Sequence, residues 1–366
     1  MGLLDYYKQF EALPEEQVNS ELREQAAERK ARELTTVQTL DLSQTTWPEA
    51  PHADVVSAIT FAARRGLHRY PRRSELASEI AHLHDVPVQR IALGNGASEL
   101  MQAATAALMR PEQTLLSLWP SYPLFPIMAR RAHGVAVPVR GGVDALLEAR
   151  AEHDTRVIAL ASPNDPSGEL MPAGELERLL AGLPESVAVL LDESLVEYAG
   201  EQAGSASLPL LERYPRLLLF RSFSKAWGLA GMRCGYAICG PGAEEVLLTL
   251  APEHGVSELS QAAALESLRN CGRVLERRVA GVAEQRAVLT SALRERGFQC
   301  SESAANFLWI AHPRLDGAEL TAELRPLGVL VAPGAPLGDP RRVRVAIHDA
   351  AASQRLLSAI DAALGR

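Results

Sequence analysis

Six apolar runs of strand length, separated by segments with a helical pattern, dominate the chain between residues 90 and 240. The runs are RIAL (90–93), TLLSL (114–118), VIALA (157–161), VAVLL (187–191), RLLLF (216–220) and GYAICG (235–240). Continuous apolar runs are typical of strands buried on both faces of a largely parallel sheet. We therefore expect an α/β fold in which helices cover both faces of one such sheet.

Polar segments rich in glycine and proline follow the carboxyl ends of five of these runs. They lie at 94–98, 119–123, 162–168, 192–193 and 221–225. In open parallel sheets, ligands bind beyond the carboxyl ends of the strands. The sequence therefore predicts a single site that collects side chains from all five segments.

The sequence on either side of this region has a different pattern. Residues 15–34 are rich in Glu, Arg and Ala, which favours a helix with a solvated face. Beyond residue 245, a helical run leads into three strand-like stretches, NFLWIAH, GVLVAP and RVRVAI. We predict three parts, which are an N-terminal helical arm (1–47), a large domain (48–245) and a smaller C-terminal α/β domain (246–366).

Composition excludes several classes of partner. The formal net charge is −8, with 37 basic and 45 acidic residues, and such a surface repels nucleic acid and anionic lipid. No apolar run approaches the ~18 residues of a membrane span, and the N-terminus lacks the pattern of a signal peptide. The four cysteines form no C-x-x-C pair and the nine histidines have no metal-ligand spacing. We expect a cytoplasmic protein with reduced thiols and no metal.

The segment Arg221–Tyr236, RSFSKAWGLAGMRCGY, contains the side chains that point most clearly to a chemical function. It places two hydroxyls, Ser222 and Ser224, beside Lys225, with Arg233 eight residues later. Hydroxyls and a guanidinium can bind a phosphate, and a lysine amine can condense with an aldehyde. Taken alone, the same residues would also suit a solvated surface turn.

This segment resembles the Schiff-base lysine motif of fold-type I pyridoxal 5'-phosphate (PLP) enzymes, S-x-x-K followed by an arginine. The chain is most similar to class I/II aminotransferases, and among them to the histidinol-phosphate aminotransferase-like group. The resemblance extends from about Tyr70 to Arg344 and includes several motifs in the family's order. It implies the PLP-dependent transferase fold, with a mainly parallel seven-stranded sheet, helices on both faces and a smaller C-terminal domain.

The resemblance also assigns cofactor-binding roles. Ala97 and Ser98 match the phosphate-binding turn at a helix N-terminus, where backbone N–H groups and the helix dipole attract an anion. Tyr122 matches the aromatic residue that stacks on the pyridine ring. Asp192 matches the carboxylate that keeps the pyridine nitrogen protonated, so that the ring can stabilise a carbanion.

Two further matches concern a second subunit and the substrate. Tyr70 matches a tyrosine that reaches the phosphate of the neighbouring subunit, which implies a homodimer. Arg344 matches the arginine that binds the substrate α-carboxylate, for which a bidentate guanidinium is suited.

Two positions depart from the family pattern. The family has asparagine as a partner of the cofactor's phenolate oxygen where this chain has Asp165. A carboxylate would repel a phenolate, so either Asp165 is protonated or it faces elsewhere and Asn164 replaces it. The family also has a tyrosine three residues after the aspartate, where this chain has Leu195, which can donate no hydrogen bond.

The function implied is a PLP-dependent aminotransferase that moves an amino group from a small-molecule donor to a 2-oxo acid through Lys225. A decarboxylase or lyase of the same fold, similar to threonine-phosphate decarboxylases, is the first alternative. A regulator without catalysis is another, but the residues before the fold show no clear helix-turn-helix. An enzyme that has lost activity is a third, because of Asp165 and Leu195. The donor and acceptor are not readable from the sequence.

Overall fold

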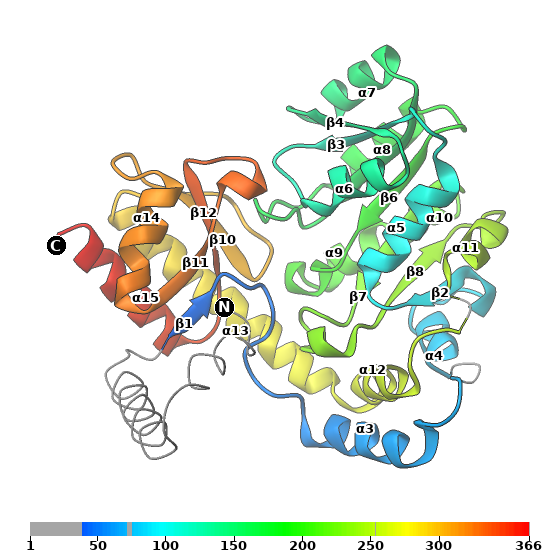
Figure 1. Ribbon diagram of the computed structural model, residues 1–366, viewed down its shortest axis with the longest axis horizontal. Coiled ribbons are helices and arrows are strands. Elements are labelled where there is room, and N and C mark those ends of the chain that lie inside the picture. Colours follow the sequence, from blue (N-terminus) through cyan, green and yellow to red (C-terminus); the bar gives the residue numbers. More distant parts are fainter. Residues whose placement is uncertain (1–38, 72–74, 253, 366) are drawn as a thin grey trace, which may run out of the picture.

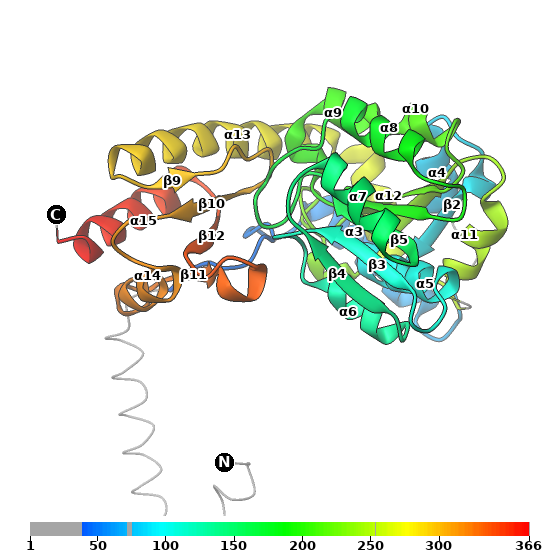
Figure 2. The same ribbon diagram turned by 90° about the horizontal axis from the view of Figure 1, so that it is seen from above.

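The computed structural model describes residues 39–71, 75–252 and 254–365 of the 366-residue chain. Figure 1 shows a large α/β unit and a smaller one, each built around its own sheet. The long helix α13 (Gly272–Glu295) extends from the large unit along the smaller one (Figure 2). The predicted helix at 15–34 lies outside the described residues.

The large unit contains a seven-stranded sheet in the order β2-β8-β7-β6-β5-β3-β4. The strands are β2 (Ile91–Gly94), β3 (Thr114–Leu118), β4 (Val135–Val139), β5 (Thr155–Ala161), β6 (Ala188–Asp192), β7 (Leu217–Ser222) and β8 (Gly235–Cys239). Five neighbouring strands, β7 through β4, run parallel, and β8 is antiparallel to both β2 and β7. The predicted mainly parallel sheet is confirmed, with one reversed strand and with β4 as an additional edge strand.

Both faces of this sheet are buried, as the continuous apolar runs predict. Along β6, Val189 and Leu191 pack into the core on one face, and Leu190 packs into the core on the other. Full burial of one such side chain contributes about 1.5–3 kcal/mol to stability. The helices that supply the first core are α3 (Ala53–Gly66), α4 (Glu75–Leu83), α7 (Val143–Glu152), α8 (Ala173–Gly182), α10 (Leu208–Leu211) and α12 (Glu258–Asn270). Those that supply the second are α5 (Ala97–Leu108), α6 (Leu124–Arg131) and α11 (Glu244–Leu250).

The smaller unit has a five-stranded sheet in the order β1-β11-β12-β10-β9. The strands are β1 (Leu40–Leu42), β9 (Gln299–Cys300), β10 (Phe307–Ala311), β11 (Val329–Pro333) and β12 (Arg342–Ala346). Its core is completed by α13, α14 (Gly317–Leu324) and α15 (Ala350–Ala363). The short helices elsewhere are α9 (Glu201–Ala206) and the 3-10 turns at 88–90, 196–199, 230–232, 325–327 and 335–337.

The packing crosses the predicted domain limits at two places. Residues 40–42, within the segment predicted as a helical arm, form β1 and pair in parallel with β11 of the smaller unit. The helices α11 and α12, which follow residue 245, pack against the large unit. Among the residues that follow 245, the side chains that join the smaller core start within α13, from Leu275 onward. The division into 1–47, 48–245 and 246–366 stays a prediction.

Among the described residues, no helix has the length and apolar character needed to span a membrane. In the same residues, no three His, Cys, Asp or Glu side chains gather in a way that could hold a metal ion.

Candidate active site

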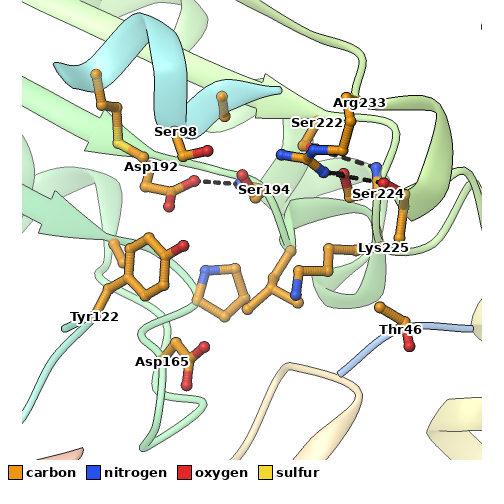
Figure 3. A pocket seen from close by; sticks show the side chains of 16 residues that line it. Thr46, Ser98, Tyr122, Asp165, Asp192, Ser194, Ser222, Ser224, Lys225 and Arg233 are labelled. Atoms are coloured by element: carbon orange, nitrogen blue, oxygen red, sulfur yellow. Dashed lines mark hydrogen bonds between the residues drawn. The ribbon is translucent and has the colours of Figure 1, made fainter. Parts of the chain in front are cut away.

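The segments that follow the strand ends line one pocket, shown in Figure 3. Ala97 and Ser98 come after β2, Tyr122 after β3, and Asp165 after β5. Asp192 and Leu195 come from the end of β6, and the group after β7 consists of Ser222, Ser224 and Lys225. This is the single convergent site that the position of the polar segments predicts, because carboxyl ends of parallel strands meet at one edge.

Lys225 lies in the turn after β7, and its amine is enclosed by protein. Its Nζ donates a hydrogen bond to the hydroxyl of Thr45 at 2.5 Å. Burial lowers the pKa of the Lys225 amine, because an ammonium group loses its hydration there. A lowered pKa increases the fraction of uncharged amine, which is the form that acts as a nucleophile.

Asp192 is the last residue of β6 and is buried. One of its oxygens accepts the backbone N–H of Ser194 at 2.9 Å. Burial raises the pKa of this carboxyl, and the positive charge of Lys225 acts in the opposite direction. A buried carboxylate of this kind is stabilised by a cationic partner, which a protonated ring nitrogen would supply.

Arg233 and the N-terminus of α5 form a site for an anion. Arg233 has a left-handed backbone (φ 49°), and its Nη1 donates to Ser224 Oγ at 3.2 Å and to the Ala230 carbonyl at 3.0 Å. Gly96, the N-cap residue of α5, has φ 89°, and a Cβ there would lie 2.5 Å from Arg233 Nη2. The guanidinium therefore packs directly on glycine backbone at a helix N-terminus, where backbone N–H groups attract phosphate.

Tyr122 lies on the pocket wall beside Phe125, with the ring planes at 85° and the centroids 5.8 Å apart. Burial raises the pKa of the Tyr122 phenol to about 12, and the charges of Asp192 and Asp165 add to the effect. The phenol therefore stays neutral at physiological pH and presents a flat ring to the pocket.

Asn164 and Asp165 point in different directions. The Asn164 amide donates to the Pro120 carbonyl at 3.1 Å and to Ser167 Oγ at 2.9 Å, and its oxygen accepts from Ser121. Asn164 is absent from the residues that line the pocket, whereas Asp165 lines it. In this structure Asp165 faces the pocket and Asn164 faces away from it, and the cofactor-binding role of either residue stays a prediction.

The partner of Asp165 is Arg344, the residue predicted to bind a substrate carboxylate. Arg344 Nη1 and Asp165 Oδ1 are 2.5 Å apart, and both side chains are 13% exposed. Neither alternative considered from the sequence included this ion pair. Leu195 is buried against the pocket and belongs to the core of the smaller unit, so it offers no polar group there.

Tyr70 does not contribute to the pocket of its own chain. Its side chain is 74% exposed and stacks on His254, with ring centroids 4.6 Å apart. In the part of the chain that the structure describes, Tyr70 makes no contribution to the site of its own subunit. Its predicted contact with the site of a neighbouring subunit stays a prediction.

The segment Ser43–Trp47 crosses the site and was missed by sequence reasoning. Thr46 lines the pocket, and Thr45 accepts the Lys225 hydrogen bond. The buried Asn306 donates to the Thr45 carbonyl at 3.1 Å, and Arg344 Nη2 donates to the Ser43 carbonyl at 3.1 Å. The available signal was a pair of adjacent hydroxyls followed by Trp-Pro in a segment otherwise assigned to an arm.

A buried ion pair supports the site from behind. Glu193 follows Asp192 and accepts from Arg221 Nε at 2.9 Å, with both side chains 7% exposed or less. Ser207 donates a further hydrogen bond to Glu193. These contacts connect the ends of β6 and β7, which carry Asp192 and Lys225.

Comparison with known proteins identifies the family. Residues 35–360 match the family model for aminotransferase class I and II. The chain is 33% identical over 303 residues to histidinol-phosphate aminotransferase 1 of Nitrosococcus oceani, a match that covers 81% of each protein. It is 34% identical over 278 residues to an aromatic amino acid aminotransferase of Cutibacterium acnes, covering 74% of this chain and 78% of that protein.

Solved structures agree on the fold. The histidinol-phosphate aminotransferase of Sinorhizobium meliloti in complex with pyridoxal-5'-phosphate superposes with a TM-score of 0.81 at 23% identity. That match covers 90% of this chain and 92% of the other. The family match, the relatives and the fold together show that the chain belongs to the aminotransferase class I and II family and is a PLP-dependent aminotransferase.

Proposed function

We propose that Lys225 is the catalytic residue and that the surrounding side chains hold PLP in a fixed orientation. The observation that carries this proposal is the presence of three distinct environments in one pocket. A buried amine (Lys225) suits the aldehyde, a buried carboxylate (Asp192) suits the pyridine nitrogen, and the Arg233 site at the α5 N-terminus suits the phosphate.

Other residues of the pocket complete this arrangement. Ala97, Ser98, Ser222 and Ser224 surround Arg233 on the phosphate side, and Tyr122 supplies a ring that can stack on the pyridine. The bound cofactor supplies an electron sink that stabilises negative charge at the donor's α-carbon. Asp192 would keep the ring nitrogen protonated, and the electron sink depends on that proton.

Lys225 would also serve as a general acid–base. Its uncharged amine would accept the proton from the donor's α-carbon, and the resulting ammonium group would return a proton to the aldehyde-derived carbon of the cofactor. Burial favours the uncharged form of Lys225, and the Thr45 hydroxyl, which accepts a hydrogen bond from Nζ, would position the amine for this role. Arg344 lies beside the pocket, where it can bind an anionic group of the substrate.

Labelling of Lys225 tests the assignment directly. The purified protein should be yellow, and borohydride should fix PLP on Lys225, as measured by peptide mass spectrometry. Lys225→Ala should abolish transamination and retain part of the non-covalent affinity for PLP. Recovery of the label on another lysine would refute the assignment.

We further propose a cytoplasmic homodimer in which Tyr70 reaches the partner subunit's site. Its 74% exposure leaves the phenol available to a second copy of the chain. The free thiols of all four cysteines support a reducing compartment. The substrates are a small-molecule amino donor and a 2-oxo acid acceptor.

A further inference from the structure

Arg278 of α13 is a buried cation without a carboxylate partner. The residue is 8% exposed, and no ion pair in the described residues includes it. Its Nε is buried and has no hydrogen-bond partner within the same ranges. An arginine side chain stays charged, and burial of an unpaired charge costs free energy. An arginine at this position is therefore better explained by the segments that it contacts than by stability.

One edge of the Arg278 guanidinium holds the turn that carries Lys225. Its Nη1 donates to the Trp227 carbonyl at 2.9 Å and to the Ala226 carbonyl at 3.3 Å. A hydrogen bond of 2.9 Å from the Gly228 N–H to the Lys225 carbonyl closes the turn. Gly228 has φ 75°, and a Cβ there would lie 2.7 Å from Nη1, so the guanidinium packs directly on glycine backbone. All three residues that follow Lys225 thus contact one guanidinium.

The face of the same guanidinium lies over the Trp47 ring, with 5.0 Å between Arg278 Cζ and the ring centroid. A cation in this position is attracted by the ring, and the attraction is greater where water is excluded. Trp47 lies two residues after Thr45, whose hydroxyl accepts the hydrogen bond from Lys225 Nζ at 2.5 Å. Arg278 therefore joins the turn that carries the amine to the segment that carries its hydrogen-bond acceptor.

These contacts lie where the two units of the chain meet. The helix α13 extends from the large unit along the smaller one (Figure 2), the turn 225–228 follows β7 of the large sheet, and the segment 43–47 follows β1 of the smaller sheet. The hydrogen bond from Lys225 to Thr45 is 2.5 Å long. A separation greater by about 1 Å would exceed the usual N–H···O range of about 2.7–3.2 Å. The contact consequently depends on the relative position of the two segments.

We propose that Arg278 is a positioning residue for the Lys225 amine: by binding both segments, it keeps Nζ against the Thr45 hydroxyl and enclosed by protein. This proposal rests on the assignment of Lys225 in the proposed function. Arg278 is not among the residues that line the pocket, so it acts only through the two segments. A planar guanidinium can donate from its edge while its face covers a ring, which a lysine ammonium group cannot do.

The first test separates kcat from KM in the holoenzyme. Arg278→Met removes the donors and the charge but keeps a long apolar side chain. We expect kcat to fall about 10- to 100-fold, because a catalytic group displaced by about 1 Å can lose that much rate. The KM of the amino donor should stay within about threefold, because no contact with the substrate is removed. Arg278→Lys keeps the charge and should recover part of the loss in kcat.

Arg277→Met is the matched control. Arg277 is the preceding residue of α13, carries the same charge and is exposed. The substitution should leave kcat within about twofold of wild type, as is usual for a surface position. A loss as large as that of Arg278→Met would overturn the proposal.

The second test measures the Lys225 amine itself in the full-length apoenzyme. Its acetylation by acetic anhydride is followed against pH, and the Lys225 peptide is quantified by mass spectrometry. Burial lowers the pKa of this amine, so entry of water into the loosened turn of Arg278→Met should raise the pKa toward the ordinary value of a lysine. The charged side chains that act on the amine are unchanged in the variant and are Asp165, Arg344, Asp192 and Arg233. An unchanged pH profile in a folded variant would show a merely structural role and overturn the proposal.

Thr45→Val tests whether Arg278 acts through the hydrogen bond to Thr45. The double variant with Arg278→Met should have a kcat within about threefold of that of Thr45→Val alone, because both substitutions remove the same contact. Losses that multiply would overturn the proposal. Arg278→Lys provides the same comparisons if Arg278→Met does not fold. Borohydride labelling of Lys225 is measured first: failure of the label refutes the proposed function, whereas normal labelling with unchanged kcat and pH profile refutes only the role of Arg278.

Discussion

Gly96→Ala should weaken PLP binding because it places a methyl group against Arg233. Gly96 is the N-cap residue of α5 with φ 89° and ψ 158°, a backbone conformation open essentially to glycine. Any other residue there adds about 1–3 kcal/mol of strain. The added Cβ would lie 2.5 Å from Arg233 Nη2 and 3.2 Å from its Cζ.

The guanidinium therefore has to move by roughly 1 Å, a displacement large enough to disturb a positioned charged group. Arg233 is held by Ser224 Oγ at 3.2 Å and the Ala230 carbonyl at 3.0 Å, so it cannot move without loss of these bonds. One charge-assisted hydrogen bond to the phosphate is worth about 1.5–3 kcal/mol. We expect the dissociation constant for PLP to rise about 10- to 100-fold.

The assay is a titration of the apoenzyme with PLP, followed by visible absorbance. Pyridoxal, which lacks the phosphate, is titrated in parallel and should bind Gly96→Ala and wild type with equal affinity. Gly174→Ala is the control, since Gly174 lies in α8 with nothing within 4 Å of an added Cβ and should bind PLP as wild type does. An unchanged affinity of Gly96→Ala for PLP, or an equal loss for pyridoxal, would refute the assignment of this turn to the phosphate.

Three further predictions follow from single contacts. Leu195→Tyr with Asp165→Asn restores two hydrogen-bond donors toward the phenolate, so the visible absorbance of the holoenzyme should titrate at lower pH by about one unit, or ~1.4 kcal/mol; a titration identical to that of the parent contradicts this. Burial lowers the pKa of His84 to about 3, so the unfolded chain binds a proton near pH 6.5 that the folded protein does not. As the pH decreases from about 6.5 to about 3, the free energy of unfolding should therefore decrease by up to ~1.4 kcal/mol per pH unit. Urea unfolding between pH 7 and pH 4 should show a smaller decrease for His84→Gln than for wild type. Tyr70→Phe should weaken PLP binding in a homodimer, and a fully active monomer by light scattering at micromolar concentration would contradict the proposed role of Tyr70.

Strongly apolar segments of the large sheet could be predicted from the sequence alone. Val189–Leu191 is apolar without interruption because both faces of β6 are covered. A short stretch of sequence is therefore sufficient to predict that this strand is buried. The same holds for the position of the site, since polar residues such as Asp192 and Lys225 directly follow buried strands. β4 was missed because it is an edge strand with Pro138 and substantial exposure, which weaken its apolar pattern.

Pairings between distant segments could not be predicted in this way. β1 has three residues, and its place beside Val329 of β11 depends on a partner almost 290 residues away. The local pattern of GYAICG likewise predicts a strand, but not that β8 runs antiparallel to its neighbours. Strand direction depends on how the connecting segments cross the sheet, and this path cannot be predicted from a short stretch of sequence.

The same distinction applies to the chemistry of the pocket. The residue types that follow the strand ends can be read from the sequence, and they include Lys225, Asp192 and Arg233 as a set of amine, carboxylate and guanidinium. The ion pair of Asp165 with Arg344, 179 residues away, and the hydrogen bond from Lys225 to Thr45 are visible only in the folded chain. Burial and strand formation depend on neighbouring residues, whereas the partner of a charged group depends on which distant segments the two sheets bring together.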